Sequence, residues 1–233
     1  MNDRQDGVPA YQLKRFKYNS HYWILKLLSE AMVPSRVLDV GTADGYLGAI
    51  LKEQGHFVVG VENELNFAEK ARRHYDRLHV ADVEQFDFSQ ELEFDYILFA
   101  DVLEHLRDPA TVLKKSLCSL KKTGQIILSV PNAANIVVRL NLLAGRFEYT
   151  DKGIMDRSHL RFFTSSTLKQ MLRECGLNAV DILASPIPVQ LVLPFTDKKW
   201  FAPLHELHQL MVCIRKPLFA YQFIARATPR IAS

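Results

Sequence analysis

Short apolar runs alternate with amphipathic segments along the first 130 residues. The runs are rich in β-branched and other apolar residues, which is typical of strands buried in a parallel sheet; they lie at 36–40, 56–61, 78–80, 96–99 and 125–130. Between them, apolar positions at helical spacing predict helices over 45–54, 65–75 and 109–120. The alternation predicts an α/β fold with a mainly parallel sheet and helices on both faces.

The flanking segments follow less regular patterns. An amphipathic helix is predicted over 20–32, where Pro34 ends it. Beyond residue 130, helices are predicted over 136–144, 165–175 and 198–207, and strands over 180–184 and 209–214. The last apolar stretch, 218–227, has one apolar face with arginines nearby, so we predict an amphipathic tail there.

This pattern divides the chain into three parts. Residues 1–34 form a helical lead-in, residues 35–216 form the α/β domain, and residues 217–233 form the tail. Within the domain, residues of about 131–164 make an insertion between the fifth strand and the next helix, where loops commonly carry specificity. Two roles are open for the tail: contact with a membrane surface, or packing on the domain or on a second copy in a homodimer.

Composition narrows the class of protein. The net charge is +3 from 29 basic and 26 acidic residues, so we expect no nucleic-acid partner, which usually needs a basic stripe. The cysteines Cys118, Cys175 and Cys213 are scattered, as expected for reduced thiols in a cytoplasmic protein. The N-terminus lacks the apolar core of a signal peptide.

Acidic residues and glycines gather where the predicted strands end. Gly41 and Gly45 allow a tight turn and close approach of a ligand to the backbone. Glu62 follows Gly41 by about 20 residues, the usual distance of an acid that binds ribose hydroxyls. Asp82 can accept a hydrogen bond from an adenine amino group. With Asp39 and Asp101, these acids predict a nucleoside-type site at one edge of the sheet.

Two ligands compete for this pattern, a nicotinamide dinucleotide and S-adenosylmethionine (SAM). The dinucleotide fingerprint places a third glycine where this chain has Tyr46. Asp39 and Asp44 would also repel a pyrophosphate. SAM carries an ammonium and a sulfonium, so acidic residues favour SAM. A nicotinamide-dependent oxidoreductase remains the weaker alternative.

The motifs VLDVGTADGYLG, VVGVE, ADVEQFD, FDYILFADVLEHLRDP and GQIILSVPN resemble those of class I SAM-dependent methyltransferases, over roughly residues 35–185. The resemblance is to their small-molecule and glycan O-methyltransferase-like branch. It implies a Rossmann-like sheet of seven strands whose last strand, here 209–214, is antiparallel. The chain departs from that family at Ala43, where the family usually has glycine.

The resemblance also implies a cofactor site, with S-adenosylhomocysteine as the product left in it. Asp39, Gly41, Ala43 and Gly45 would line the methionine part of SAM, Glu62 would bind the ribose, and Asp82 and Val83 the adenine. Ala100 would touch the cofactor near its reactive end. Thr42, Asn63 and Asp101 complete the predicted cofactor-binding set.

The insertion contains DRSHLRFFT, similar to a stretch in methyltransferases of bacterial polysaccharide and lipid-glycan gene neighbourhoods. Asp156 and Arg161 are candidate substrate-binding residues. His159, and after it His105, is the candidate base, because methyl transfer to a hydroxyl releases a proton. Alternatively these histidines only order their loops, and the enzyme works by positioning.

The sequence therefore predicts SAM-dependent methyl transfer to a small-molecule, glycan or lipid-linked acceptor, at oxygen. No metal site is predicted. A module that binds SAM without transferring its methyl group is the alternative from a different class.

Overall fold

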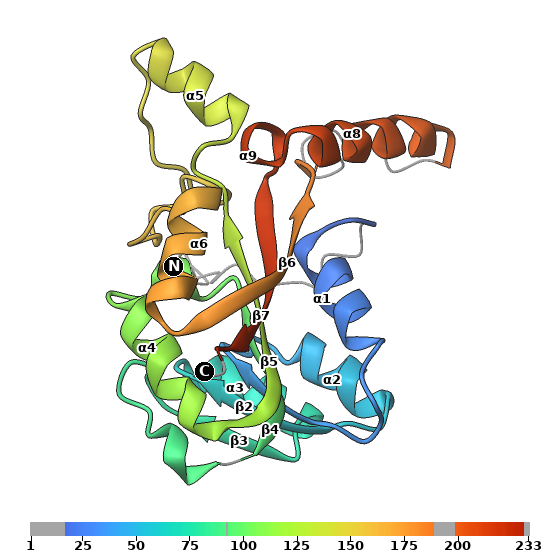
Figure 1. Cartoon of the computed structure of the whole chain (residues 1–233), viewed down its shortest axis with the longest axis vertical. Helices are drawn as coiled ribbons and strands as arrows, with labels where there is room; N and C mark the ends of the chain where they lie inside the picture. Colours follow the sequence, from blue (N-terminus) through green and yellow to red (C-terminus); the bar gives the residue numbers. More distant parts are fainter. Residues whose placement is uncertain (1–16, 92, 189–198, 231–233) are drawn as a thin grey trace, which may run out of the picture.

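The computed structural model describes residues 17–91, 93–188 and 199–230. Its centre is a seven-stranded sheet with the order β3-β2-β1-β4-β5-β7-β6 (Figure 1). The strands are β1 (Arg36–Val40), β2 (Phe57–Glu62), β3 (Arg77–Val80), β4 (Phe94–Ala100), β5 (Leu120–Pro131), β6 (Leu177–Ser185) and β7 (Gln222–Pro229). All neighbours pair in parallel except β7, which is antiparallel to both β5 and β6. The predicted seven-stranded, mainly parallel α/β sheet is confirmed.

Helices cover both faces of the sheet. On one face, α1 (Ser20–Leu28) and α2 (Tyr46–Glu53) bury side chains such as Ile24 and Leu47 against β1 and β4. On the other face, α4 (Pro109–Ser116) and α6 (Ser165–Glu174) bury side chains such as Leu113 and Leu172. The remaining short elements before the insertion are α3 (Leu65–Ala71) and the 3-10 turns η1 (Arg72–His74), η2 (Phe88–Gln90), η3 (Leu103–His105) and η4 (Leu117–Ser119).

Side-chain caps fix where several helices begin. The Asn19 carboxamide accepts a hydrogen bond from the backbone N–H of Tyr22 at 2.8 Å and starts α1. Asp108 caps α4 in the same way through Thr111 N–H at 3.0 Å, and Pro109 occupies the first turn, where its missing N–H costs nothing. Thr164 and Thr167 form a reciprocal capping box on α6.

The order of the strands determines where a ligand can bind. From β1 the chain runs outward through β2 to β3, and it then returns to β4 on the other side of β1. The carboxyl ends of β1 and β4 therefore lie at the topological switch point, where α/β sheets open a crevice. The loops after these two strands begin at Gly41 and Asp101.

The C-terminal region differs from the sequence prediction. Residues 209–214 belong to α8 (Ala202–Ile214), which follows η6 (Lys199–Phe201) and precedes α9 (Lys216–Phe219). Their burial has helical spacing, because Gln209 and Val212 are buried whereas Leu210 and Met211 are exposed. The assignment of 209–214 as the last strand is wrong, since short apolar runs look alike in helices and strands.

The predicted amphipathic tail is also corrected. Residues 222–229 form β7, which is inserted between β5 and β6 and completes the sheet. Phe223, Ile224 and Ala225 of this strand are completely buried. The segment is therefore part of the core and cannot lie on a membrane surface. Residues 1–16 of the predicted lead-in, residue 198 and residues 231–233 lie outside the described residues.

The predicted insertion leaves the sheet after β5 and carries α5 (Ile136–Leu143). Two buried asparagines fix its start: the amides of Asn132 and Asn135 donate to the carbonyl of Ala220, at 2.9 and 2.8 Å. Asn132 also pairs with Phe163, so the insertion closes on itself before α6. None of the helices in the described part of the chain is long and apolar enough to cross a membrane.

Candidate functional site

A cleft of about 450 Å³ opens at the carboxyl edge of β1, β2 and β3, beside the switch point. Five residues predicted from the sequence line it: Gly41, Asn63, Asp82, Val83 and His105. Its other lining residues were not predicted, namely Val61, Ala81, Glu84, Gln85, Val102, Leu106, Arg107 and Leu160. Most of these lie directly before or after a predicted residue in the chain, so the strand-end rule could have found them.

The glycine-containing turn after β1 is held by Glu62. One carboxylate oxygen of Glu62 accepts the backbone N–H of Ala43 at 2.8 Å, and the other accepts that of Glu64 at 2.9 Å. Gly41, Ala43 and Gly45 have positive φ angles of 74°, 47° and 86°. The left-handed conformation costs alanine about 1–2 kcal/mol, so the two hydrogen bonds of Glu62 help to keep the turn in place.

Asp39 lies behind the cleft and does not line it. Its side chain is buried, and one oxygen accepts a hydrogen bond from the Tyr75 hydroxyl at 2.6 Å. The other oxygen is buried without a hydrogen-bond partner. Burial raises the pKa of Asp39 to about 7, with the Tyr75 hydrogen bond opposing and the charge of Glu62 adding to the shift. With this pKa, the Asp39 carboxyl group is protonated in part of the molecules near neutral pH.

The acid after β3 belongs to the wall of the cleft. One oxygen of Asp82 accepts the backbone N–H of Glu84 at 2.9 Å, and the other accepts the Gln85 amide at 3.3 Å. This Asx-type turn presents the carboxylate and the neighbouring Val83 to the same space. The polar and apolar pair matches an amino-bearing aromatic ring such as adenine.

At the end of β4, Asp101 is the centre of a polar cluster that the sequence did not predict. Its carboxylate accepts hydrogen bonds from the Gln222 amide at 2.9 Å and from the Ser20 hydroxyl at 3.3 Å, and it also contacts the Ser129 hydroxyl. Asp101 has φ 58°. The cluster joins α1, β4, β5 and β7. The sequence does not reveal it, because its pattern predicts a tail over 217–233 and not a strand beside β5.

The remaining predicted cofactor residues lie under the turn. Thr42 is buried and its methyl group packs against Gly60, while Ala100 is nearly buried at the end of β4. Val102 covers Gly41 so closely that a Cβ on the glycine would lie 2.5 Å from the valine methyl group. Thr42, Ala43, Gly45, Glu62, Ala100 and Asp101 therefore shape the turn beside the cleft, rather than lining it.

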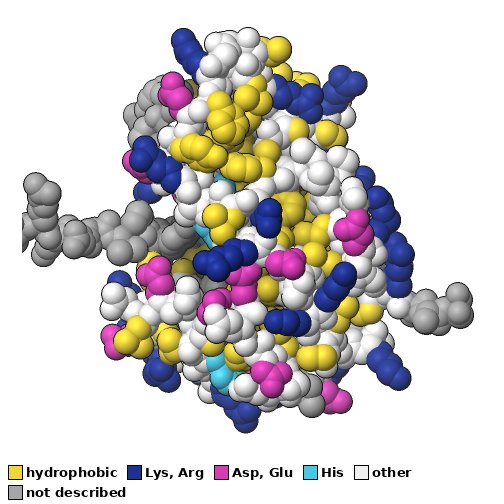
Figure 2. Space-filling model, turned by 90° about the vertical axis from the view of Figure 1, so that its left-hand side faces the viewer, with side chains coloured by type: hydrophobic (Ala, Val, Ile, Leu, Met, Phe, Trp, Pro, Cys, Tyr) yellow, Lys and Arg dark blue, Asp and Glu magenta, His cyan; other side chains and the backbone are white. Residues whose placement is uncertain are grey.

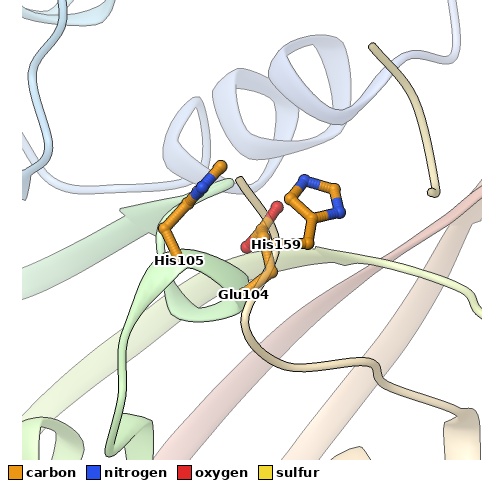
Figure 3. Close-up of side chains that lie close together, drawn as sticks. All are labelled: Glu104, His105 and His159. Carbon is orange, nitrogen blue, oxygen red and sulfur yellow. The ribbon is translucent and has the colours of Figure 1, made fainter. Parts of the chain in front are cut away.

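Three side chains with lone pairs meet where the insertion contacts the loop after β4 (Figure 3). Glu104 and His105 come from η3, and His159 comes from the insertion. The two imidazole rings meet edge to face with centroids 4.9 Å apart. The backbone of Glu104 is bound there too, because its carbonyl accepts the N–H groups of Leu160 and Arg161 at 2.8 and 3.0 Å.

Each imidazole has one nitrogen tied to the backbone. His105 Nδ1 lies 3.3 Å from the carbonyl of Ser158, and His159 Nδ1 lies 3.1 Å from that of Ile154. A carbonyl only accepts, so both Nδ1 atoms carry hydrogen and both Nε2 atoms of the neutral rings can accept a proton. Burial, and then the nearby His159, lower the pKa of His105 below its usual value. His105 is therefore neutral at pH 7.

The same cluster has the donor types of a cation site. Within the described residues, Glu104, His105 and His159 form a group whose ligand atoms all lie within 4.8 Å of one another. Two imidazoles and one carboxylate are a common ligand set for divalent transition metals. The geometry thus permits either proton transfer or cation binding at this place.

The two predicted substrate residues hold the insertion. Asp156 accepts the backbone N–H and the hydroxyl of Ser158, at 2.8 and 2.6 Å. Arg161 is exposed and its Nε donates to the carbonyl of Arg107 at 2.9 Å. The Asp156 contact holds Ser158 beside His105, and the Arg161 contact holds the insertion against Arg107 in the cleft wall. Asp156 and Arg161 therefore order the loop in this structure.

A family model described as a methyltransferase domain matches residues 11–182 of the chain, which is more than half of its length. The chain belongs to this methyltransferase family. The matched residues include β1 to β5, the insertion and α6.

Curated members of known name share part of this methyltransferase sequence. A tRNA 5-carboxymethoxyuridine methyltransferase of Escherichia coli (strain K12) is 32% identical over 127 residues, which are 51% of this chain and 48% of that protein. A ubiquinone biosynthesis O-methyltransferase of Neisseria meningitidis serogroup C is 30% identical over 156 residues, 63% of this chain and 65% of that protein. The chain thus spans 48% to 65% of the length of these relatives.

Solved methyltransferase structures have the same fold. A Burkholderia thailandensis 1,6-didemethyltoxoflavin-N1-methyltransferase with bound 1,6-didemethyltoxoflavin and S-adenosylhomocysteine superposes with a TM-score of 0.60 at 20% identity, covering 92% of this chain and 80% of that one. A magnesium protoporphyrin IX methyltransferase from Synechocystis PCC 6803 with bound SAH gives 0.61 at 14% identity, covering 89% and 80%. At these identities the likeness concerns the fold of the methyltransferase domain alone.

Proposed function

We propose that this chain is a SAM-dependent methyltransferase that acts on a small-molecule acceptor. The observation that carries the proposal is the cleft beside the switch point. Gly41 and Asp82 both line this cleft, and Glu62 holds the turn after β1 in place. Such a site suits a nucleoside with a positively charged tail, because its walls offer carboxylates and a bare backbone. Membership of the methyltransferase family supports the same function.

The residues present fit SAM. Asp82 and Val83 would hold the adenine, Asn63 and Glu62 the ribose, and the turn from Gly41 to Gly45 the methionine part. This turn would meet the ammonium group of SAM. Behind it lies the buried carboxyl group of Asp39, which has one oxygen that accepts no hydrogen bond. When bound, SAM supplies an electrophilic methyl group on its sulfonium.

The acceptor would be held between the cleft and the insertion. There the chain orients the acceptor atom and excludes water, which can account for much of the rate enhancement of a methyl transfer. For an acceptor hydroxyl, His159 Nε2 would take the proton that is released, with His105 as the second candidate. The hydrogen bonds from Nδ1 to backbone carbonyls keep both Nε2 atoms available.

Transfer to oxygen is the acceptor chemistry that we infer. It is supported by the similarity to a ubiquinone biosynthesis O-methyltransferase and by His105, which lines the cleft and whose pKa is lowered by burial. The similarity to a tRNA methyltransferase means that the expected absence of a nucleic-acid partner stays a prediction. A glycan acceptor, a homodimer and a cytoplasmic location stay predictions too.

Thermal melts with S-adenosylhomocysteine, SAM and NADH in parallel test the cofactor. A ligand at about 100 times its dissociation constant adds roughly 2.7 kcal/mol, which raises Tm by about 5–10 °C in a domain of this size. We expect this rise with the two adenosyl compounds alone. A rise with NADH alone would instead support the oxidoreductase alternative, and no rise with any of the three would contradict the proposal.

Turnover separates an enzyme from a module that only binds SAM. The full chain is incubated with SAM carrying a labelled methyl group and with an acceptor panel of catechols, prenylated phenols, sugars and tRNA. Label in a phenolic or other small hydroxyl product is the expected result. Cofactor binding without label in any acceptor would favour the non-catalytic module, whereas label in tRNA alone would move the acceptor to a nucleic acid.

A further inference from the structure

Two helices at the carboxyl edge of the sheet expose apolar side chains to solvent. α5 follows β5, and α8 lies between β6 and β7, so both project from the end of the molecule where these parallel strands finish (Figure 1). The exposed fractions range from 42% for Met211 to 84% for Leu143. The full set is Val137, Leu140, Leu142 and Leu143 on α5, and Leu204, Leu207, Leu210, Met211 and Ile214 on α8.

On α8 these side chains form a stripe that the fold does not use. Gln209 and Val212 are the buried residues of the helix and pack toward the sheet. Leu204, Leu207, Met211 and Ile214 follow one another at intervals of three or four residues, so they share the opposite face. The helix is therefore apolar on two sides, and a soluble helix normally needs only one.

Positive charge surrounds these apolar residues. Residues 131–147 contain Arg139 and Arg146 and no acidic residue. Residues 200–220 contain Arg215 and Lys216 and a single acid, Glu206, whose carboxylate already binds Lys17 at 2.6 Å. Figure 2 shows hydrophobic side chains gathered at the upper end of the molecule, with Lys and Arg side chains and some Asp or Glu side chains beside them.

We propose that α5 and α8 form a docking face for an anionic membrane surface. The face is made of the exposed apolar residues named above together with the exposed Arg139, Arg146 and Arg215. Apolar helix faces with flanking cations partition into the boundary between headgroups and acyl chains, and the anionic lipid attracts the cations. Cations outnumber the acids Glu148 and Glu206 beside this face, and the net positive charge favours an anionic lipid surface over a second copy of the chain, which would bring like net charges together.

Docking places the insertion and the mouth of the cleft at the level of the lipid. The exposed Trp200, in η6 just before α8, would lie in the interface, where tryptophan is enriched. If the proposed methyltransferase function holds, an acceptor with a membrane-resident apolar tail could reach the histidines without leaving the bilayer. That consequence rests on the proposed function, whereas docking itself can be measured without any turnover.

Vesicle flotation of the full chain tests the docking face. The vesicles contain phosphatidylcholine alone or phosphatidylcholine with phosphatidylglycerol, at low and high salt. We expect the protein to float with the anionic vesicles and to be released by salt. Leu207→Glu/Ile214→Glu should lower the bound fraction by about tenfold or more, because two exposed apolar side chains that would enter the lipid are replaced by charges. Met32→Glu, at an exposed apolar site between α1 and β1, should float like the wild type.

A charge variant separates the two attractions. Arg146→Gln/Arg215→Gln should weaken binding to anionic vesicles by more than about tenfold, since each cation near such a surface contributes about 1 kcal/mol. It should leave the response to cofactor in a thermal melt unchanged. The proposal fails if the wild type does not float, or if the α8 variant floats as well as the wild type. A dimer in solution that Leu207→Glu dissociates, without any vesicle binding, would assign the face to a second copy.

Discussion

Asp39 combines deep burial with a pKa near neutrality, and this has a measurable effect on stability. Its pKa is about 7 in the folded protein against 3.8 for an ordinary aspartate. Between these values the folded chain binds the proton and the unfolded chain does not, so the free energy of unfolding falls as pH rises through this window. Each unit of pKa difference corresponds to about 1.4 kcal/mol.

Asp39→Asn should remove this dependence. The quantity compared is the free energy of unfolding of the variant minus that of the wild type. We expect this difference to be larger at pH 8 than at pH 5, by more than about 1.4 kcal/mol. Urea unfolding of both proteins at the two pH values measures it. The asparagine can still accept the hydrogen bond of Tyr75, so the comparison isolates the charge. An identical stability difference at both pH values would show that the Asp39 carboxyl is already ionised at pH 5.

The histidine pair makes a second prediction at the level of single residues. If His159 is the base, His159→Gln should lower kcat by about 10²–10⁴-fold and leave the dissociation constant of S-adenosylhomocysteine unchanged. For His105 the lowered pKa predicts a specific pH profile: the acid-side loss of activity due to His105 should lie below pH 6.5. Turnover between pH 5 and 8 for the wild type, His159→Gln and His105→Gln distinguishes the two.

A chelator provides the opposing outcome. If dialysis against EDTA abolishes turnover and a divalent cation restores it, then Glu104, His105 and His159 are metal ligands. The predicted absence of a metal site would then be wrong. If EDTA has no effect and both histidine variants keep full kcat, the enzyme works by positioning alone.

The sequence could locate the site residues but not their contacts. Gly41 and Asp82 were found because strand ends in an alternating α/β pattern must meet at one edge, whereas Val83 was implied only by the family resemblance. The hydrogen bonds of Glu62 to the turn could not be predicted from the sequence, because they depend on the φ angles of Gly41 and Ala43. Ser20 and Gln222 come from distant parts of the chain, and no local pattern announces their meeting at Asp101.

At the level of elements, prediction was reliable where a buried strand alternates with a capped helix. It was unreliable after residue 185, for two physical reasons. The outward stripe of α8 makes 209–214 look continuously apolar, like a buried strand. In β7, Arg226 interrupts the apolar run but pairs with Asp181 and Glu30, so a charged residue can occupy a strand inside the sheet.

The attachment of the insertion can be tested through Asn135. Its carboxamide caps α5 by accepting from Val137 N–H at 2.9 Å, and its amide donates to the buried carbonyl of Ala220 at 2.8 Å. Asn135→Ala loses the cap and leaves that carbonyl with fewer partners, so we expect a loss of about 1–3 kcal/mol in urea unfolding. The matched control Asn141→Ala, on the exposed face of α5, should change stability by less than about 0.5 kcal/mol. Equal effects of the two would mean that the asparagine at 135 does not anchor the insertion.

At the scale of the whole molecule, the sheet is completed by the part of the chain that comes last. β7 pairs with β5 from Ile126↔Ala227 to Pro131↔Gln222, and with β6 from Leu177↔Pro229 to Ser185↔Gln222. Without β7, both neighbours would be left with unpaired edges, and β6 would lose its only strand partner among the described residues. The fold of residues 35–216 is therefore not independent of residues 217–233, although the sequence pattern separates them.

Truncation after Lys216 follows from this arrangement. A peripheral tail could be removed at little cost, whereas removal of β7 takes the fully buried Phe223, Ile224 and Ala225 out of the core and leaves unpaired backbone groups. We expect the shortened chain to show no cooperative thermal transition. Phe223→Ala in the full chain supplies a graded version, with an expected loss of about 3–5 kcal/mol. If the truncated chain still melts cooperatively within a few degrees of the full protein, then β5 and β6 form a stable sheet without β7. Other side chains would then have to fill the core under β7.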